Sequence, residues 1–109
     1  MTEYIPKRGD ICWLDFNPQK GTEQAKRRPA FVLSDDLFNQ KGLVFVCPIT
    51  SQKPRHGFHI KLPNELFTRG SVMTEQLKSL DWEARRAEYI ESSPRGLYTT
   101  VRGIVDQIL

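Results

Sequence analysis

Apolar residues fall in short runs along the first part of the chain, and each run predicts a β-strand. Ile11–Phe16 is rich in aromatic and β-favouring residues and is followed by an Asn-Pro turn signal. Phe31–Leu33 predicts a short buried strand introduced by Pro29. Leu43–Ile49 is a longer, continuous apolar run, which is typical of a strand that is covered on both faces.

Polar residues separate these runs. A polar loop is predicted over 19–28, between the first and second strands. The segment 35–42 predicts one helical turn that ends at Gly42, because glycine commonly follows the last residue of a helix. These signals leave the first half of the chain mainly β.

The pattern after the third run is weaker and alternates. Phe58–Leu62 alternates apolar and polar residues, as a half-exposed strand does, and this places His59 on the outer face. Two further strands are predicted over 71–77 and 78–82, the second continuing toward Arg85.

The apolar period changes near the end of the chain, where it indicates a helix. One stripe at helical spacing contains Leu97, Val101, Ile104, Val105 and Ile108. Ser93 is the predicted N-cap and Pro94 the first helical residue, where a missing N–H costs nothing. Strands followed by one helix predict a mainly β fold, a small antiparallel sheet or partly closed barrel capped by the C-terminal helix.

Length and composition fit one small globular domain. The chain has 109 residues, 39% of them apolar and 27% charged, and no linker or repeat divides it, so we expect a single domain over 1–109. No apolar run approaches the length of a membrane-spanning helix, so we expect a cytoplasmic protein without membrane contact. Cys12 and Cys47 lie 35 positions apart within predicted strands and are expected to be reduced core residues.

The distribution of charge is more informative than the net value of +3. Residues 1–55 hold nine Lys or Arg and six Asp or Glu, whereas 56–109 hold seven of each. The interval between Asp36 and Glu65 contains no acidic residue, and a second basic cluster lies within 20–28. These segments are either solvated loops or, if the fold brings them together, a positive surface that attracts phosphate backbones.

A series of short motifs extends in order along nearly the whole chain. The motifs are Tyr4-Ile5-Pro6, Gly9-Asp10-Ile11, Asp15-Phe16-Asn17-Pro18, Gly21-Thr22-Glu23-Gln24, Arg28-Pro29-Ala30-Phe31-Val32-Leu33-Ser34, Pro48-Ile49-Thr50-Ser51-Gln52, Gly70 to Gln76 and Lys78-Ser79-Leu80-Asp81-Trp82. Each motif alone is weak, but their ordered succession resembles the MazF/PemK family of toxin endoribonucleases.

The resemblance implies a fold, an activity and partners. The implied fold is the SH3-like antiparallel barrel of plasmid-maintenance toxins, which forms homodimers. The implied activity is sequence-selective cleavage of single-stranded RNA, including messenger RNA, restrained by a cognate antitoxin. We expect that antitoxin to carry an acidic, disordered tail, because such a tail complements a positive groove. Two other classes stay open: a gyrase-poisoning toxin of the same barrel fold, and a noncatalytic RNA-binding barrel.

RNA supplies its own nucleophile, the 2′-hydroxyl, so neither a metal nor a cofactor is expected. The resemblance makes Arg28 a catalytic residue, and its planar guanidinium suits the charge that develops on phosphate oxygens. The resemblance also implies a catalytic hydroxyl at Thr50 or Ser51. Adjacent side chains of a strand point to opposite faces, so we expect only one of the two at the phosphate and slightly favour Thr50.

Two glutamates are candidates for the general base. Glu75 falls where some family members place an acidic residue, and it would suit that role if burial raised its pKa toward neutrality. Glu23 is the competing base, or it positions Arg28 through an ion pair. The chain departs from one branch of the family at Thr22 and Met73, so the proton-transfer scheme of that branch does not transfer. A purely structural role for either glutamate also stays open.

The remaining candidates are expected to bind RNA rather than to react with it. Basic side chains that would neutralise flanking phosphates are Lys26, Arg27, Lys53 and Arg55. His59, like His56, is either a substrate contact or merely exposed. Phe16 is either a platform on which a base stacks or part of the core.

Overall fold

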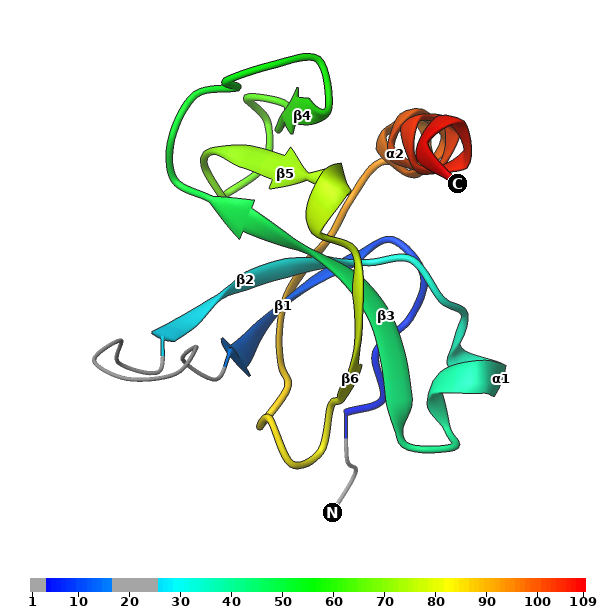
Figure 1. The fold of residues 1–109 in the computed structure, drawn as a ribbon. Coiled ribbons are helices and arrows are strands. Elements are labelled where there is room, and N and C mark those ends of the chain that lie inside the picture. The colour runs from blue at the N-terminus through cyan, green and yellow to red at the C-terminus, as the bar shows by residue number, and fades with distance from the viewer. Residues whose placement is uncertain (1–3, 17–25) are drawn as a thin grey trace, which may run out of the picture.

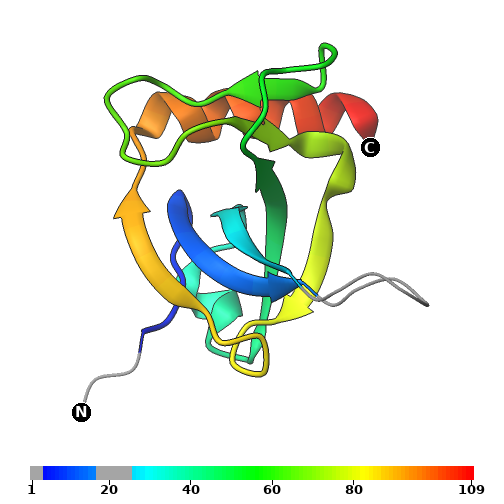
Figure 2. The same cartoon turned by 90° about the vertical axis from the view of Figure 1, so that its left-hand side faces the viewer.

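The strands pair into one curled antiparallel sheet, and the computed structural model describes residues 4–16 and 26–109 of it. The elements are β1 (Asp10–Phe16), β2 (Lys26–Val32), α1 (Asp36–Asn39), β3 (Leu43–Thr50), β4 (His59–Lys61), β5 (Ser71–Met73), the 3₁₀ turn η1 (Thr74–Gln76), β6 (Lys78–Asp81), β7 (Glu88–Ser92) and α2 (Arg95–Ile108). Within the described ranges the seven strands run in the order β4-β5-β3-β2-β1-β7, and β6 pairs with β3. The strands curve around a common interior, and α2 lies across one end (Figures 1 and 2). The predicted mainly β class with a C-terminal helix is confirmed.

The sheet buries apolar side chains on both faces, which explains why the strand sequences are so apolar. Alternation along β2 sends Phe31 into one cluster and Ala30 and Val32 into the other. The first cluster lies between the sheet and α2, which contributes Leu97, Val101 and Val105. The second contains Cys12, Leu14, Val44, Val46, Leu80 and Trp82. The helical stripe predicted from the sequence is therefore confirmed at the three positions that α2 buries.

The second strand begins earlier than the sequence predicts. Lys26, Arg27 and Arg28 belong to β2 rather than to a polar loop, because β1 pairs with them, Asp15 opposite Arg27 and Leu14 opposite Arg28. Hydrogen bonding to a neighbouring strand satisfies the backbone whatever the side chains are. The expectation of a loop through Arg28 was wrong for this reason.

The third strand is covered on both faces only in its second half. Leu43 and Phe45 are 45% and 40% exposed, whereas residues 46–49 are buried. The two-sided burial expected for the whole run is therefore wrong at its start. Asp35 caps α1 by accepting a hydrogen bond from the amide of Phe38. The predicted helical turn is present, but it ends at Asn39, three residues before Gly42, which has a φ of 107°.

The segment after β4 is divided differently from the prediction. The strand predicted over 71–77 ends at Met73 and continues as the turn η1, and the strand predicted toward Arg85 ends at Asp81. The sequence pattern did not reveal β7 (Glu88–Ser92), which pairs with β1 at the edge of the sheet.

The start of α2 also differs from the prediction. Its N-cap is Pro94, and the hydroxyl of Ser93 donates instead to the carbonyl of Gly9 at 2.6 Å. Ser93 thus joins the end of β7 to the start of β1.

Both cysteines are buried and unpaired, as expected. Burial is the main cause that raises the pKa of Cys12 and of Cys47 to about 12, so both remain thiols. Within the two described ranges, no helix is both long and apolar enough to cross a membrane.

Candidate active site

A hollow of about 310 Å³ lies beyond the last paired residues of β2 and β3. Arg28 and Thr50, both predicted from the sequence to be catalytic, line it. Its lining residues are Arg27, Arg28, Pro29, Ile49, Thr50, Ser51 and Gln52. The last paired residues of the two strands are Ala30 and Pro48. Continuing this antiparallel register by two residues places Arg28 opposite Thr50. Opposed residues of antiparallel strands project to the same face, so the guanidinium and the hydroxyl approach the hollow together.

The neighbouring hydroxyl has a second environment. Ser51 also lines a largely apolar hollow with Trp13, Phe67 and Ile90, and this hollow shares Pro29 and Ile49 with the first. The hydroxyl of Thr50 accepts a hydrogen bond from the amide of Gln52 at 3.3 Å, which fixes its orientation at the strand end. The strand register thus places Thr50 on the face of Arg28, while Ser51 lines the same hollow from the next position.

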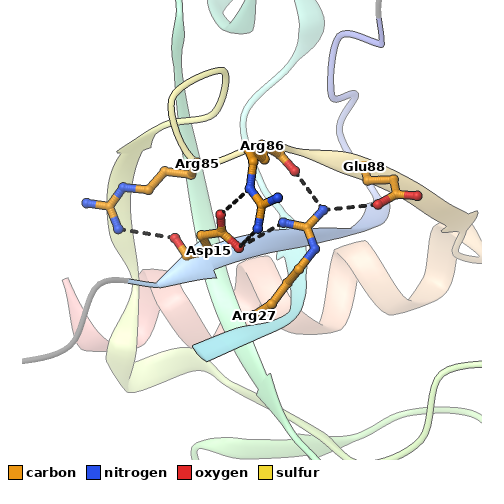
Figure 3. Close-up of polar contacts among 5 residues, drawn as sticks. All are labelled: Asp15, Arg27, Arg85, Arg86 and Glu88. Carbon is orange, nitrogen blue, oxygen red and sulfur yellow. Dashed lines mark hydrogen bonds and ion pairs between the residues drawn. The ribbon is translucent and has the colours of Figure 1, made fainter. Parts of the chain in front are cut away.

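Arg27 is held by a network of polar contacts (Figure 3). Its guanidinium donates to Asp15 Oδ1 at 2.9 Å and to the carbonyl of Arg86 at 2.8 Å, and it pairs with Glu88 Oε1 at 3.1 Å. Arg86 Nε donates to the other oxygen of Asp15 at 2.6 Å. Hydrogen bonds from Arg86, and then from Arg27, lower the pKa of Asp15 to about 2. The guanidinium of Arg27 thus links β1, β2 and β7, and its role in RNA binding stays a prediction.

A second hollow of about 440 Å³ adjoins the first, because Thr50 and Gln52 line both. Its other lining residues are Arg55, His56, His59, Met73, Glu75 and Gln76. The two hollows together extend from Arg28 past Thr50 to Glu75.

His59 points inward, so the outward position predicted for it was wrong. It is 8% exposed, because the register pairs it with the buried Met73 of β5. Its Nε2 lies 3.0 Å from Glu75 Oε2, and its Nδ1 accepts a hydrogen bond from the amide of Arg55 at 3.2 Å. An imidazole that accepts at Nδ1 carries its hydrogen on Nε2 when neutral, so His59 donates to Glu75.

His56 has similar contacts to Glu75 and to the backbone, but its side chain is more exposed than that of His59. Its Nδ1 accepts from the amide of Phe58 at 3.2 Å, and its Nε2 lies 3.9 Å from the same oxygen of Glu75. The centres of the His56 and His59 rings are 4.1 Å apart. The histidine spacing in an acid-free segment is visible in the sequence, but Glu75 belongs to a distant segment, so the sequence alone did not group the three.

Glu75 has a pKa below its ordinary value. Partial burial raises that pKa, but the hydrogen bonds from its own backbone amide and from His59, with the nearby His56, outweigh burial. The condition named for a base role, a pKa raised by burial, is therefore not met at Glu75, because these donors come from its own backbone and from a distant segment.

The atoms of His56, His59 and Glu75 that could bind a metal lie within 4.8 Å of one another. The sequence had suggested no such cluster. Both Nδ1 atoms accept backbone N–H groups, so in the neutral rings the hydrogens occupy Nε2, the atoms that face Glu75. Metal-bound histidines show the opposite pattern, in which the second ring nitrogen donates outward. The geometry therefore fits two N–H donors around a carboxylate rather than a cation.

The other predicted residues lie around these hollows or outside the described ranges. Lys53 and Arg55 are exposed on the segment between β3 and β4, and Arg55 lines the second hollow. Phe16 packs against the second core cluster, with Lys78 Nζ 5.6 Å from its ring centre, so its place is at the edge of the core. Glu23 and the side chain of Lys26 fall outside the residues that the structure describes.

An arginine and a hydroxyl on one face of a small β-barrel, beside a basic segment, define a protein suited to engage a phosphodiester. The sequence matches the family described as PemK-like, MazF-like toxin of type II toxin-antitoxin systems over residues 7–109. The chain therefore belongs to this toxin family.

Individual relatives agree with this assignment. The chain is 40% identical to the endoribonuclease toxin MazF of Escherichia coli over 88 residues, which are 80% of this chain and 78% of that protein. It is 34% identical to the endoribonuclease EndoA of Bacillus subtilis over 83 residues, 71% of this chain and 72% of the relative. A solved MazE-MazF structure from Deinococcus radiodurans matches with a TM-score of 0.90 and 40% identity, covering 97% of this chain and 96% of that one.

Proposed function

We propose that this chain is an endoribonuclease toxin that cleaves single-stranded RNA, messenger RNA included, at a short sequence. Its relatives named as endoribonucleases support the activity. The observation that carries the proposal is the shared face of Arg28 and Thr50 at the end of the β2–β3 pairing, where both line one hollow.

The chemistry follows from what RNA brings to this site. A general base takes the 2′-hydroxyl proton while the 2′-oxygen forms a bond to phosphorus, and the bond from phosphorus to the 5′-oxygen breaks. The leaving oxygen takes a proton from Arg28 or from water, which gives a 2′,3′-cyclic phosphate and a 5′-hydroxyl. Arg28 stabilises the charge on the phosphate oxygens, and the hydroxyl of Thr50 donates to the same phosphate. The substrate contains the nucleophile, so this route uses no metal-activated water.

The partners are proposed from the family and from the charge of the surface. MazE-MazF structures among the relatives support a cognate antitoxin. We propose that its acidic tail lies along the exposed Lys53 and Arg55, where it competes with RNA. We also propose a homodimer of single-domain chains acting in the cytoplasm, as the family resemblance implies.

The test is cleavage of a long single-stranded RNA of known sequence by the purified protein in EDTA, with both new ends identified. We expect cyclic-phosphate and 5′-hydroxyl ends at a recurring short sequence. The Arg28→Ala variant should lower turnover by about 100- to 1,000-fold, because the transition-state charge loses its donor. Arg102→Ala is the matched control, since Arg102 pairs with Asp106 on the exposed side of α2.

Three results would contradict this proposal. Intact RNA that nevertheless binds the protein would favour a noncatalytic RNA-binding barrel. Growth arrest without RNA fragments and without dependence on Arg28 would favour the gyrase-poisoning class. Activity that disappears in EDTA and returns with a divalent cation would exclude the mechanism.

A further inference from the structure

The histidine contacts of Glu75 meet at one carboxylate oxygen. His59 Nε2 lies 3.0 Å from Oε2, and His56 Nε2 lies 3.9 Å from the same atom. The backbone amide of Glu75 also bonds the carboxylate. Glu75 and Thr50 line the same hollow, so His59 holds this carboxylate beside the end of β3.

Resting on the proposed RNA cleavage, with Glu75 as the base that the family resemblance implies, we propose that the buried His59 is the positioning residue of this carboxylate. His59 is itself fixed, because it is 8% exposed and its Nδ1 accepts the amide of Arg55. One ring therefore connects the backbone of the segment before β4 to the carboxylate of η1. This geometry supplies the orientation that a base must have before it can accept a proton.

The same hydrogen bonds prevent the neutral histidines from acting as the base. Each Nδ1 lone pair is engaged by a backbone N–H, and each Nε2 carries a hydrogen. Neither ring has a lone pair to offer a 2′-hydroxyl. In the step itself the proton moves from the 2′-oxygen to the carboxylate of Glu75, His59 keeps its hydrogen throughout, and Glu75 afterwards releases the proton to water.

A lowered pKa makes Glu75 a weaker base but keeps the carboxylate ionised at neutral pH, and the hydrogen bond from His59 is one of its causes. The orientation of the carboxylate, and not its pKa, therefore supports the positioning role of His59. The other titratable or charged groups that face it are His56 and Arg55 on the segment before β4, and Cys47 on β3. Burial, with the charge of Glu75, raises the pKa of Cys47 to about 12, so this thiol does not titrate in the same range.

The experiment compares two substitutions of His59 in cleavage of a short RNA that contains the recognised sequence. His59→Leu removes the donor, whereas the amide nitrogen of His59→Gln can still donate to Glu75. We expect kcat/KM of His59→Leu to fall by about 10- to 100-fold, with partial recovery in His59→Gln. The acid limb of the kcat/KM profile should move to higher pH in His59→Leu, because the carboxylate loses a hydrogen bond that lowers its pKa.

A double-mutant comparison separates positioning from general stability. Glu75→Gln should lower kcat by about 100- to 10,000-fold. Adding His59→Leu to Glu75→Gln should cause little further loss, because His59 acts through the missing carboxylate. Thermal unfolding of every variant shows whether the fold is retained.

Several results would overturn the inference while the proposed function stands. These are an unchanged acid limb in a folded His59→Leu, an equal loss from His59→Leu in both backgrounds, or near-normal cleavage by Glu75→Gln. If His59→Leu does not fold, the pH profile of His59→Gln and the activity of Glu75→Gln decide the question. Failure of the unmodified protein to cleave RNA would instead refute the proposed function.

Discussion

Arg27 and Arg28 are neighbours in β2, yet the pleat of the strand gives them different surroundings. Arg27 faces Asp15 and joins an ion-pair network, while Arg28 lies opposite Leu14. Both arginines line the hollow beside Thr50, but the ion pairs tie Arg27 to β1 and β7. The same alternation predicts that the hydroxyls of Thr50 and Ser51 project to opposite faces.

Substitution of these hydroxyls tests that distinction directly. Thr50→Val keeps the shape of the side chain but loses the donor that faces the phosphate, so we expect kcat to fall by about 100-fold. Ser51→Ala should cleave at nearly the unmodified rate, because Ser51 is predicted to project to the other face. Single-turnover cleavage of one RNA oligonucleotide measures the cleavage rates of both variants. A greater loss from Ser51→Ala would show that the register slips beyond Ala30 and Pro48.

The ion pairs of Asp15 predict how stability depends on pH. The pKa of Asp15 is lowered in the folded protein to about 2 from 3.8, so its contribution is complete above pH 4 and is lost as the pH falls toward 2. Asp15→Asn should therefore lower the free energy of unfolding near neutrality. The difference from the unmodified protein should vanish near pH 2.

Urea unfolding of both proteins at a series of pH values measures this difference. High salt should reduce it, because the pairs lie near the surface. Asp106→Asn, on an exposed helical pair, serves as the control. A difference that is constant from pH 7 to pH 2 would show that Asp15 stabilises the fold by other means.

At the scale of elements, the start of β5 is packed against the end of β3 that carries Thr50. Gly70 has a φ of 116°, and a Cβ at this position would lie 1.8 Å from the carbonyl oxygen of Thr50. Gly42 has a similar φ of 107° but has open space around it. The two glycines thus separate the cost of backbone conformation from the cost of a collision.

Alanine at each glycine should have different effects on stability and activity. Gly42→Ala should destabilise by about 1–2 kcal/mol through its backbone conformation alone. Gly70→Ala should cost about 1–3 kcal/mol more and should also lower kcat, because Thr50 must move. Denaturant unfolding and RNA cleavage measure both quantities. Equal losses of stability, with normal cleavage by Gly70→Ala, would show that β3 and β5 separate easily.

The elements that could be predicted from the sequence are those whose own side chains determine them. α2 was predicted because Leu97, Val101 and Val105 repeat at the helical period and are buried against the sheet. β7 was missed because Glu88–Ser92 is an exposed edge strand with few apolar residues, and its partner β1 specifies it.

The candidate site could be predicted in part. Arg28 and Thr50 were selected through short motifs, and the structure brings them to one hollow. The burial of His59 depends on its pairing with Met73, and the pKa of Glu75 depends on His59, so both required contacts between distant segments.

At the scale of the whole molecule, the two hollows and the exposed basic segment after β3 form one continuous surface around Thr50. Reversing the charge at Lys53 and Arg55 together should weaken binding of RNA and of an acidic antitoxin tail alike, most strongly at low salt. Fluorescence anisotropy with a labelled RNA and with a labelled acidic peptide from the cognate antitoxin measures both affinities. Reversal of Lys7, near the start of β1, is the matched control. Weaker RNA binding with unchanged inhibition would place the antitoxin elsewhere.

The pairing of the first strand with the last has a consequence for the timing of synthesis. β1 needs β7 as its neighbour, Asp10 lies opposite Ser92, and α2 supplies part of the core. These partners leave the ribosome long after β1 does, and contacts so distant in sequence form late in folding. A nascent chain that ends soon after Thr50 contains Arg28 and Thr50 but still lacks β7 and α2, which complete the fold around them. A nascent chain is thus expected not to cleave the message from which it is being translated.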